Sequence, residues 1–278
     1  YFALNDQEAK VANVIRNRAH RCYFVALLGY FKSRPVVLSP SFGDVEEDLR
    51  FIAKEQLPGP SIRRFSLDQK QKDRLYQKIF DLLNYQKWRD KQDRSVLITH
   101  LQQIAKSWIE PRYLFDATTE YLSLCRIAIP KYTVMQTVVS QAMKLERERI
   151  TSTLQNLLSE WLSAKLADLM DGKESLPLSK LRLSAKSFTP PELEKELKVN
   201  RLIEPWMSEV NTVVKTLSLS IKNQHHFASM VDYYGSKLKR FDRFTQQLYL
   251  LCYLQDRSEQ NSERLADGFI YHTRKINE

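Results

Sequence analysis

The chain has 278 residues, of which 43% are hydrophobic and 11% aromatic, and this composition excludes an intrinsically disordered protein. Glycine is scarce, at six residues, so the chain favours helices over sheet. The formal net charge is +10, and residues 1–150 carry 25 Lys and Arg against 17 Asp and Glu. A polyanionic partner should therefore contact mainly the first half of the chain.

The first 93 residues predict one helical module. Asn5 or Asp6 is placed to cap its first helix, and Ser66 is placed to cap its last. The apolar stripe of the first helix is Val11, Val14 and Ile15. The four predicted helices cover residues 6–15, 22–31, 41–57 and 66–83.

A second helical module follows over residues 94–171. A helix ends near Cys125, residues 127–132 form a turn, and Thr133 is placed to cap the next helix. The four predicted helices cover residues 95–110, 112–127, 133–149 and 152–170.

Residues 172–200 are rich in Gly, Ser, Pro and Lys, which predicts a linker. Residues 201–278 complete the chain as a further helical region. We find no internal repeat and no convincing strand, and only "RPVVLSP" is β-like. The predicted fold class is therefore all-α, with two helix-turn-helix modules. The helices predicted after residue 190 cover 191–198, 204–220, 225–234, 246–256 and 261 to the end.

Signatures of catalysis and of membrane insertion are absent from the sequence. It has no phosphate-loop, dinucleotide, kinase, nucleophile-elbow or zinc-protease pattern. His225 and His226 are consecutive, so on a helix they point about 100° apart and make no ready metal site. No apolar run approaches 18 residues, and the start has no signal-peptide pattern. We expect no catalytic residue, metal, cofactor, small-molecule substrate or membrane contact in this segment.

The three cysteines lie more than a hundred residues apart, in apolar helical surroundings and without metal-binding spacing. We expect Cys22, Cys125 and Cys252 to be buried, reduced thiols in a cytoplasmic protein. The sequence begins at Tyr1 rather than Met, so we also expect it to be part of a longer chain.

The turn at residues 127–132 and the helix after it match the requirements of a helix-turn-helix. With Val134, Val138, Val139 and Ala142 facing a core, the opposite face is polar. Gln pairs with adenine, Ser and Thr contact either base type, and Lys suits phosphates. The same pattern fits an ordinary helical hairpin with a solvated face.

Three other basic segments allow two interpretations each. The helix after Ser66 suits groove entry or simple exposure, and the Arg16–Arg21 cluster could clamp phosphates or cap the C-terminus of the first helix. The connector Lys87–Arg94 could follow a groove as an arm, although its Trp88 is more often a core anchor. The candidate DNA contacts are Arg16, Arg18, His20, Arg21, Arg63, Arg64, Ser66, Gln69, Lys70, Lys72, Arg74, Lys87, Arg89, Lys91, Arg94, Lys131, Tyr132, Thr133, Gln136, Thr137, Ser140, Gln141 and Lys144.

The order of four segments resembles the N-terminal region of replicative transposases of the Tn-three family. At the family's helix start Arg21 and Phe24 match, whereas His20 and Tyr23 replace the usual Asn and Gly. The segment "IAIPKYTVMQTVV" resembles the family's turn before a helix. The matching segments begin "YFALNDQEAK", "DLRFIAKEQL", "WIEPRYLFDA" and "DYYGSKLKRF".

The resemblance implies a non-catalytic segment that binds the double-stranded terminal inverted repeats of a transposon. It implies a bacterial, nucleoid-associated protein that is a homodimer at full length. It also implies a downstream RNase H-like domain whose Asp, Asp and Glu bind Mg²⁺. The alternative function is a helical protein-interaction or dimerisation scaffold with incidental basic charge. A nuclease acting on its own is a third and weaker hypothesis.

Overall fold

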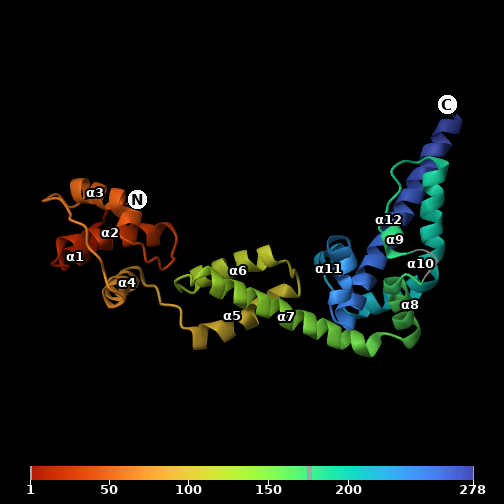
Figure 1. Cartoon of the computed structure of the whole chain (residues 1–278), viewed down its shortest axis with the longest axis horizontal. Coiled ribbons are helices and arrows are strands. Elements are labelled where there is room, and N and C mark those ends of the chain that lie inside the picture. Colours follow the sequence, from red (N-terminus) through yellow and green to blue (C-terminus); the bar gives the residue numbers. More distant parts are fainter. Residues whose placement is uncertain (1, 174–176, 278) are drawn as a thin grey trace. The chain divides into compact units, whose positions relative to one another are not determined.

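The computed structural model describes residues 2–173 and 177–277, whose contacts form two compact units (Figure 1). The first unit contains Tyr1–Leu101 and Phe115–Ser140, and the second contains Gln102–Leu114 and Gln141–Glu278. The described residues form twelve α-helices and two short 3-10 helices, and their β-type pairing is limited to two isolated bridges. The predicted all-α class is confirmed.

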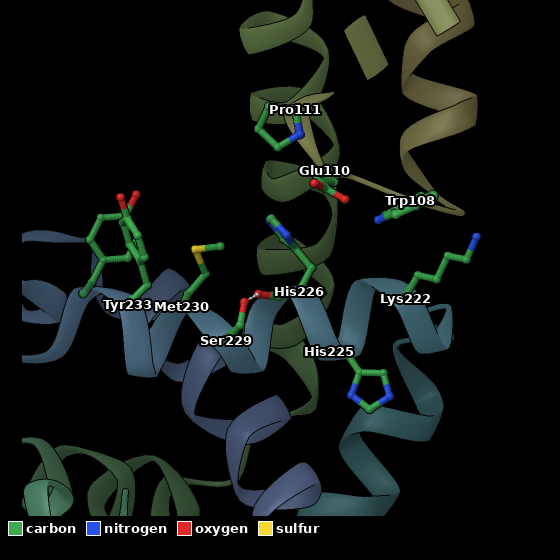
Figure 2. Close-up of a pocket in the computed structure, with 10 residues that line it drawn as sticks. Trp108, Glu110, Pro111, Lys222, His225, His226, Ser229, Met230 and Tyr233 are labelled. Carbon is green, nitrogen blue, oxygen red and sulfur yellow. Dashed lines mark hydrogen bonds between the residues drawn. The ribbon is translucent and has the colours of Figure 1, made fainter. Parts of the chain in front are cut away.

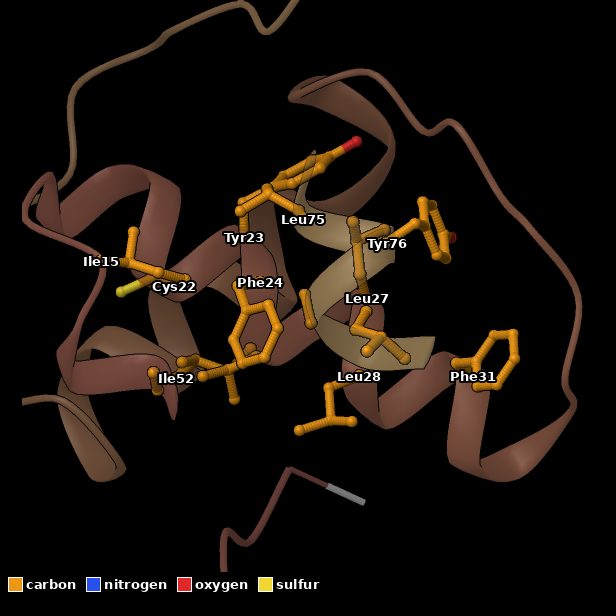
Figure 3. Close-up of a cluster of buried hydrophobic side chains, with 14 of the residues drawn as sticks. Ile15, Cys22, Tyr23, Phe24, Leu27, Leu28, Phe31, Ile52, Leu75 and Tyr76 are labelled. Atoms are coloured by element: carbon orange, nitrogen blue, oxygen red, sulfur yellow. The ribbon is translucent and has the colours of Figure 1, made fainter. Parts of the chain in front are cut away.

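Helix α2 (Arg18–Ser33) is the centre of the first unit. Its side chains from Cys22 to Leu28 are buried in succession, as expected for a helix that is apolar on all sides. Figure 3 shows Phe24, Leu27 and Phe31 in the resulting apolar cluster. The elements around α2 are α1 (Asp6–Asn13), η1 (Gly43–Val45), α3 (Glu46–Glu55) and α4 (Gln69–Leu83).

Two capping boxes fix helix starts in this unit. Glu8 N donates to Asn5 Oδ1 at 2.9 Å and Asn5 N donates to Glu8 Oε2 at 2.9 Å, so the predicted Asn5 cap is confirmed. The predicted Ser66 cap is wrong, because α4 is capped by Asp68. Gln71 N donates to Asp68 Oδ1 at 2.7 Å, and Asp68 N donates to Gln71 Oε1 at 3.0 Å. This reciprocal pair satisfies two donors at the start of α4.

The next three helices are α5 (Asp90–Ala105), α6 (Pro111–Leu124) and α7 (Tyr132–Leu157). Each begins in one unit and ends in the other. The Lys131 carbonyl accepts from Val134 N at 2.9 Å and from Met135 N at 3.2 Å, so α7 starts immediately after Lys131. The predicted Thr133 cap is therefore wrong, since Thr133 already lies within the first turn.

In the second unit, two long helices each replace a pair of predicted helices. A single helix α10 continues through Pro205, and a single helix α12 replaces the last two predicted segments. The predicted linker 172–200 contains α9 and the first turns of α10, and its residues 174–176 lie outside the described residues. Helices α10 and α11 both pack against α12. The elements are α8 (Glu160–Asp171), α9 (Leu178–Leu181), α10 (Pro190–Thr216), α11 (Ile221–Tyr234), η2 (Gly235–Arg240) and α12 (Arg243–Asn277).

Two expectations of burial fail at helix ends. Val14 is 69% exposed, because it follows the last turn of α1 and no longer continues its stripe. Cys125 is exposed because it follows Leu124, the last residue of α6, whereas Cys22 and Cys252 are buried as predicted. Beyond the end of α1 the predicted stripe thus holds for Ile15, which is buried, and fails for Val14.

Candidate nucleic-acid interface

Three segments that are distant in sequence meet beside the turn that precedes α7. Gln86 N donates to the Arg126 carbonyl at 2.7 Å, and Ala128 N donates to the Gln86 carbonyl at 2.8 Å. Ile129 N donates to the Pro35 carbonyl at 2.7 Å. Parallel bridges join residues 86 and 127 and residues 36 and 129. These contacts all lie in the first unit and attach the turn to the loops after α2 and α4.

Exposed cations belong to all three segments. Arg34 precedes Pro35, Lys87 follows Gln86, and Arg126 and Lys131 border the turn. The Arg126 guanidinium lies 5.4 Å from the centre of the Tyr85 ring, and Lys87 Nζ lies 3.8 Å from Asp73 Oδ1. A pair this exposed contributes little to stability, so it leaves Lys87 available to another anion. We call Arg34, Lys87, Arg126 and Lys131 the turn cluster.

The turn cluster was only partly predicted from sequence. Lys87 and Lys131 are among the predicted contacts, whereas Arg34 and Arg126 are not. No local pattern marks these two arginines, because each joins the cluster through main-chain bonds between residues about 40 or more positions apart. Arg126 also has a left-handed backbone with φ +54°, which is uncommon for a residue with a side chain.

Helix α7 separates its apolar and polar sides as the sequence predicts. Met135, Val138, Val139 and Ala142 are buried. Thr137 Oγ1 donates to the Thr133 carbonyl at 2.8 Å, Tyr132 packs against Phe115, and Lys144 pairs with Glu148 at 3.7 Å. The predicted contacts of this segment are all exposed: Lys131, just before α7, and Tyr132, Thr133, Gln136, Thr137, Ser140, Gln141 and Lys144 in its first turns. Amide and hydroxyl groups therefore follow a basic helix start.

The predicted contacts near α4 divide between exposed groups and groups with internal partners. Lys72 Nζ donates to Ser39 Oγ at 3.0 Å, which ties α4 to the loop after α2. Gln69 Nε2 donates to Asp73 Oδ1 at 3.0 Å. The predicted contacts that are exposed in this segment are Arg63, Arg64, Ser66, Gln69, Lys70 and Arg74.

The arginines at the start of α2 serve the fold. Arg18 donates to the main-chain oxygens of Ala53, Leu57 and Pro60, and Arg21 donates twice to the Ile15 carbonyl, at 2.9 and 3.1 Å. The Ile15 carbonyl follows α1, so the Arg21 contact fits the predicted capping of the first helix, whereas the partners of Arg18 belong to the end of α3 and the loop after it. His20 packs near Phe65, and Arg16 is exposed.

The connector is helical from Asp90 onward, so that part is not an extended arm. Arg94 pairs with Asp90 at 2.8 Å and Arg89 pairs with Asp93 at 3.5 Å, while Lys91 is exposed. Hydrogen bonds from Arg94 and then from Trp88 lower the pKa of Asp90. Each arginine here has an acidic neighbour one helical turn away, which reduces the positive field of α5.

The described residues contain no group of three or more His, Cys, Asp or Glu placed to hold a metal ion. Within them, no helix combines the length and the apolar character that crossing a membrane requires. His225 Nδ1 lies 3.0 Å from Asp256 Oδ1, and burial lowers the pKa of His226. The two histidines thus have separate surroundings, as their spacing predicts.

The structure defines an all-helical protein whose first unit gathers exposed cations beside the start of α7. The chain belongs to the family described as "Domain of unknown function (DUF4158)", whose model matches residues 1–142. No curated protein matches the chain significantly. The matched residues end two positions after the last residue of the first unit, Ser140.

Proposed function

We propose that the chain binds double-stranded DNA sequence-specifically, at the terminal inverted repeats of a transposon. In this proposal it is the non-catalytic N-terminal part of a Tn-three-family replicative transposase. It needs no metal or cofactor of its own, and the full-length protein acts as a homodimer beside the bacterial nucleoid. Strand cleavage then belongs to a downstream Mg²⁺-dependent domain.

The observation that carries the proposal is the turn cluster beside the polar side of α7. Lysine and arginine groups neutralise phosphates and fix a protein's register on DNA, whereas amide and hydroxyl groups discriminate bases. Lys131 supplies the first role at the helix start, and Gln136 and Thr137 supply the second one turn later. The free main-chain N–H groups of a helix start add to phosphate binding.

The sequence resemblance supports the same function independently. The segments that resemble the transposase family include both the turn at residues 127–132 and the α2 region. The excess of basic residues over acidic ones is also concentrated in residues 1–150. With about six to ten phosphate contacts, affinity should fall steeply as salt rises.

A scaffold function is the second candidate, and exposed apolar side chains near the end of α12 favour it. Phe269 is 74% exposed and Ile276 is 83% exposed, and Ile270 and Tyr271 lie between them. Large exposed apolar residues on consecutive turns are typical of protein-binding surfaces. This function predicts a concentration-dependent oligomer and no binding of DNA.

The test is fluorescence anisotropy of the chain with a duplex that carries the element's inverted repeat and with a scrambled duplex, at two salt concentrations. Gln136→Ala with Thr137→Ala should remove most of the preference for the repeat, at about 1–3 kcal/mol per lost base contact. The matched control is Gln155→Ala, which truncates an exposed glutamine later in α7. Equal affinity of the unaltered chain for both duplexes would contradict specific recognition.

A further inference from the structure

A groove of about 710 Å³ lies in the second unit, between residues 108–111 and helix α11. Figure 2 shows Trp108 and Tyr233 at opposite ends of the groove and His226 pointing from α11 towards Glu110 and Pro111. The volume falls within the range of about 300–1,000 Å³ found for small-molecule sites. None of these residues belongs to the proposed duplex-binding surface.

The groove has a fixed wall. The buried Asn223 side chain accepts from Ile109 N at 2.7 Å and donates to the carbonyls of Ala105 and Lys106, at 2.8 and 3.0 Å. Ser220 Oγ adds a bond to the Ser107 carbonyl at 2.7 Å. These four bonds hold the segment that carries Trp108 against the start of α11, so the indole has a defined position.

Trp108 already makes the contacts of a stacking platform. The Tyr113 ring is stacked on it, with centroids 4.5 Å apart and an interplanar angle of 28°. The Lys222 ammonium lies 4.0 Å from the centre of the Trp108 ring. Lys222 is exposed, so its side chain can leave the ring at little cost. A nucleobase stacked on an aromatic side chain is bound more strongly than an exposed ammonium.

The displaced Lys222 ammonium suits the phosphate of a nucleotide, and the polar groups of the groove suit the edge of its base. Once off the ring, the Lys222 ammonium is within reach of the phosphate that accompanies the base. The Glu110 carboxylate is an acceptor for the exocyclic amine of cytosine. His226 is neutral at pH 7, because burial and then the Arg147 charge lower its pKa against the opposing effect of Glu110. A cationic ligand is disfavoured by Lys222 and Arg147.

We propose that this groove binds an unpaired base of single-stranded DNA, stacked on Trp108 in place of Lys222 and recognised along its edge by Glu110. A base in a duplex has its amine already paired and its faces already stacked, so it cannot enter. The inference does not depend on the duplex-binding function proposed above, because it uses other residues in the other unit.

The experiment measures binding of the full chain to a fluorescent single-stranded oligodeoxycytidine. Trp108→Ala should weaken binding about tenfold or more, the loss expected for one stacked base. Trp108→Phe keeps an aromatic ring and should retain most of the affinity, which separates stacking from misfolding. The matched control is Trp161→Ala, because Trp161 is 47% exposed on α8 in the same unit and outside the groove.

Two further arms identify the occupant. Oligothymidine lacks the exocyclic amine, so it should bind more weakly than oligodeoxycytidine, and Glu110→Gln should reduce that difference. Tighter binding of single-stranded RNA would overturn DNA as the occupant. Unchanged binding in Trp108→Ala, an equal loss in Trp161→Ala, or no binding of single strands would overturn the site. Loss of duplex binding alone would overturn only the proposed function.

Discussion

Arg18→Ala tests whether the arginines at the start of α2 hold the fold or contact DNA. The guanidinium donates to the Ala53 carbonyl at 3.1 Å, to the Leu57 carbonyl at 2.7 Å and to the Pro60 carbonyl. Hydrogen bonds from a charged donor each contribute about 1.5–3 kcal/mol, and the contribution falls when water can replace the donor. Because these carbonyls are near the surface, we expect a total loss of about 2–3 kcal/mol.

The assay is hydrogen exchange of the peptides that cover α3 and residues 56–60. A loss of about 2–3 kcal/mol should accelerate their exchange about 30- to 150-fold where exchange follows the opening equilibrium. Arg16→Ala is the matched control, because Arg16 is exposed two positions earlier, and it should leave this exchange unchanged. Exchange in Arg18→Ala within twofold of the unaltered chain would refute the capping role. Weaker DNA binding by the folded Arg18 variant would show that the guanidinium also serves the interface.

Three further predictions concern thiols, a buried ion pair and pH. Of the three cysteines, Cys125 alone is exposed, so a thiol reagent should modify one equivalent rapidly and two slowly, and Cys125→Ser should abolish the rapid phase. Glu196→Ala should destabilise the second unit by about 3–5 kcal/mol, because it leaves the buried Arg257 charge without its carboxylate at 2.7 Å; a urea titration that shows a much smaller loss would contradict this. The pKa of His226 lies below 6.5 in the folded chain, so the unfolded chain takes up the proton first, and stability should fall as pH drops below 6.5. The melting temperature of His226→Gln should fall less than that of the unaltered chain as the pH is lowered. An equal fall in both proteins would refute the contribution of His226 to acid destabilisation.

Local patterns predicted the helices and several of their faces. Asn5 with Glu8 three residues later is a capping box, and the structure has both of its hydrogen bonds. Val138, Val139 and Ala142 recur at helical spacing and are buried. These features depend on residues within one or two turns of each other, so the sequence contains all the information that determines them.

The errors arose where two local signals compete. Ser66 with Gln69 and Asp68 with Gln71 both have the spacing of a capping box, and the structure forms the second. Thr133 is likewise a capping type, but the Lys131 carbonyl accepts the first helical bonds. Separate helices were predicted over residues 191–198 and 204–220, yet α10 runs through both and through the gap between them. At Ser66 and Thr133 the side-chain preference was present and a neighbouring residue supplied the cap.

Non-local contacts could not be predicted from one sequence. Arg34 and Arg126 join Lys87 only because residues 35, 86 and 126–129 share main-chain hydrogen bonds. The same kind of contact gives Arg18 internal partners that lie 35 or more positions away, which its local sequence does not indicate. Basic charge is therefore a weak guide to a DNA surface until the partners of each cation are known.

The two proposed sites differ in how much of each lies within the family region, residues 1–142, and they belong to different units. Residues 1–142 include the turn cluster and the exposed residues of α7 up to Gln141. A family member that shares only this region would therefore contain nearly all of the duplex-binding surface. Residues 1–142 also include Trp108 and Glu110, but not α11, which supplies Lys222 and His226. Asn223, which fixes the Trp108 segment, is likewise on α11. The family region therefore contains the wall of the groove formed by Trp108 and Glu110. The opposite wall is α11, which lies after the matched residues and also supplies the contacts that fix the Trp108 segment. Single-strand binding should accordingly be a property of chains that carry an equivalent of α11, whereas duplex recognition should not require it.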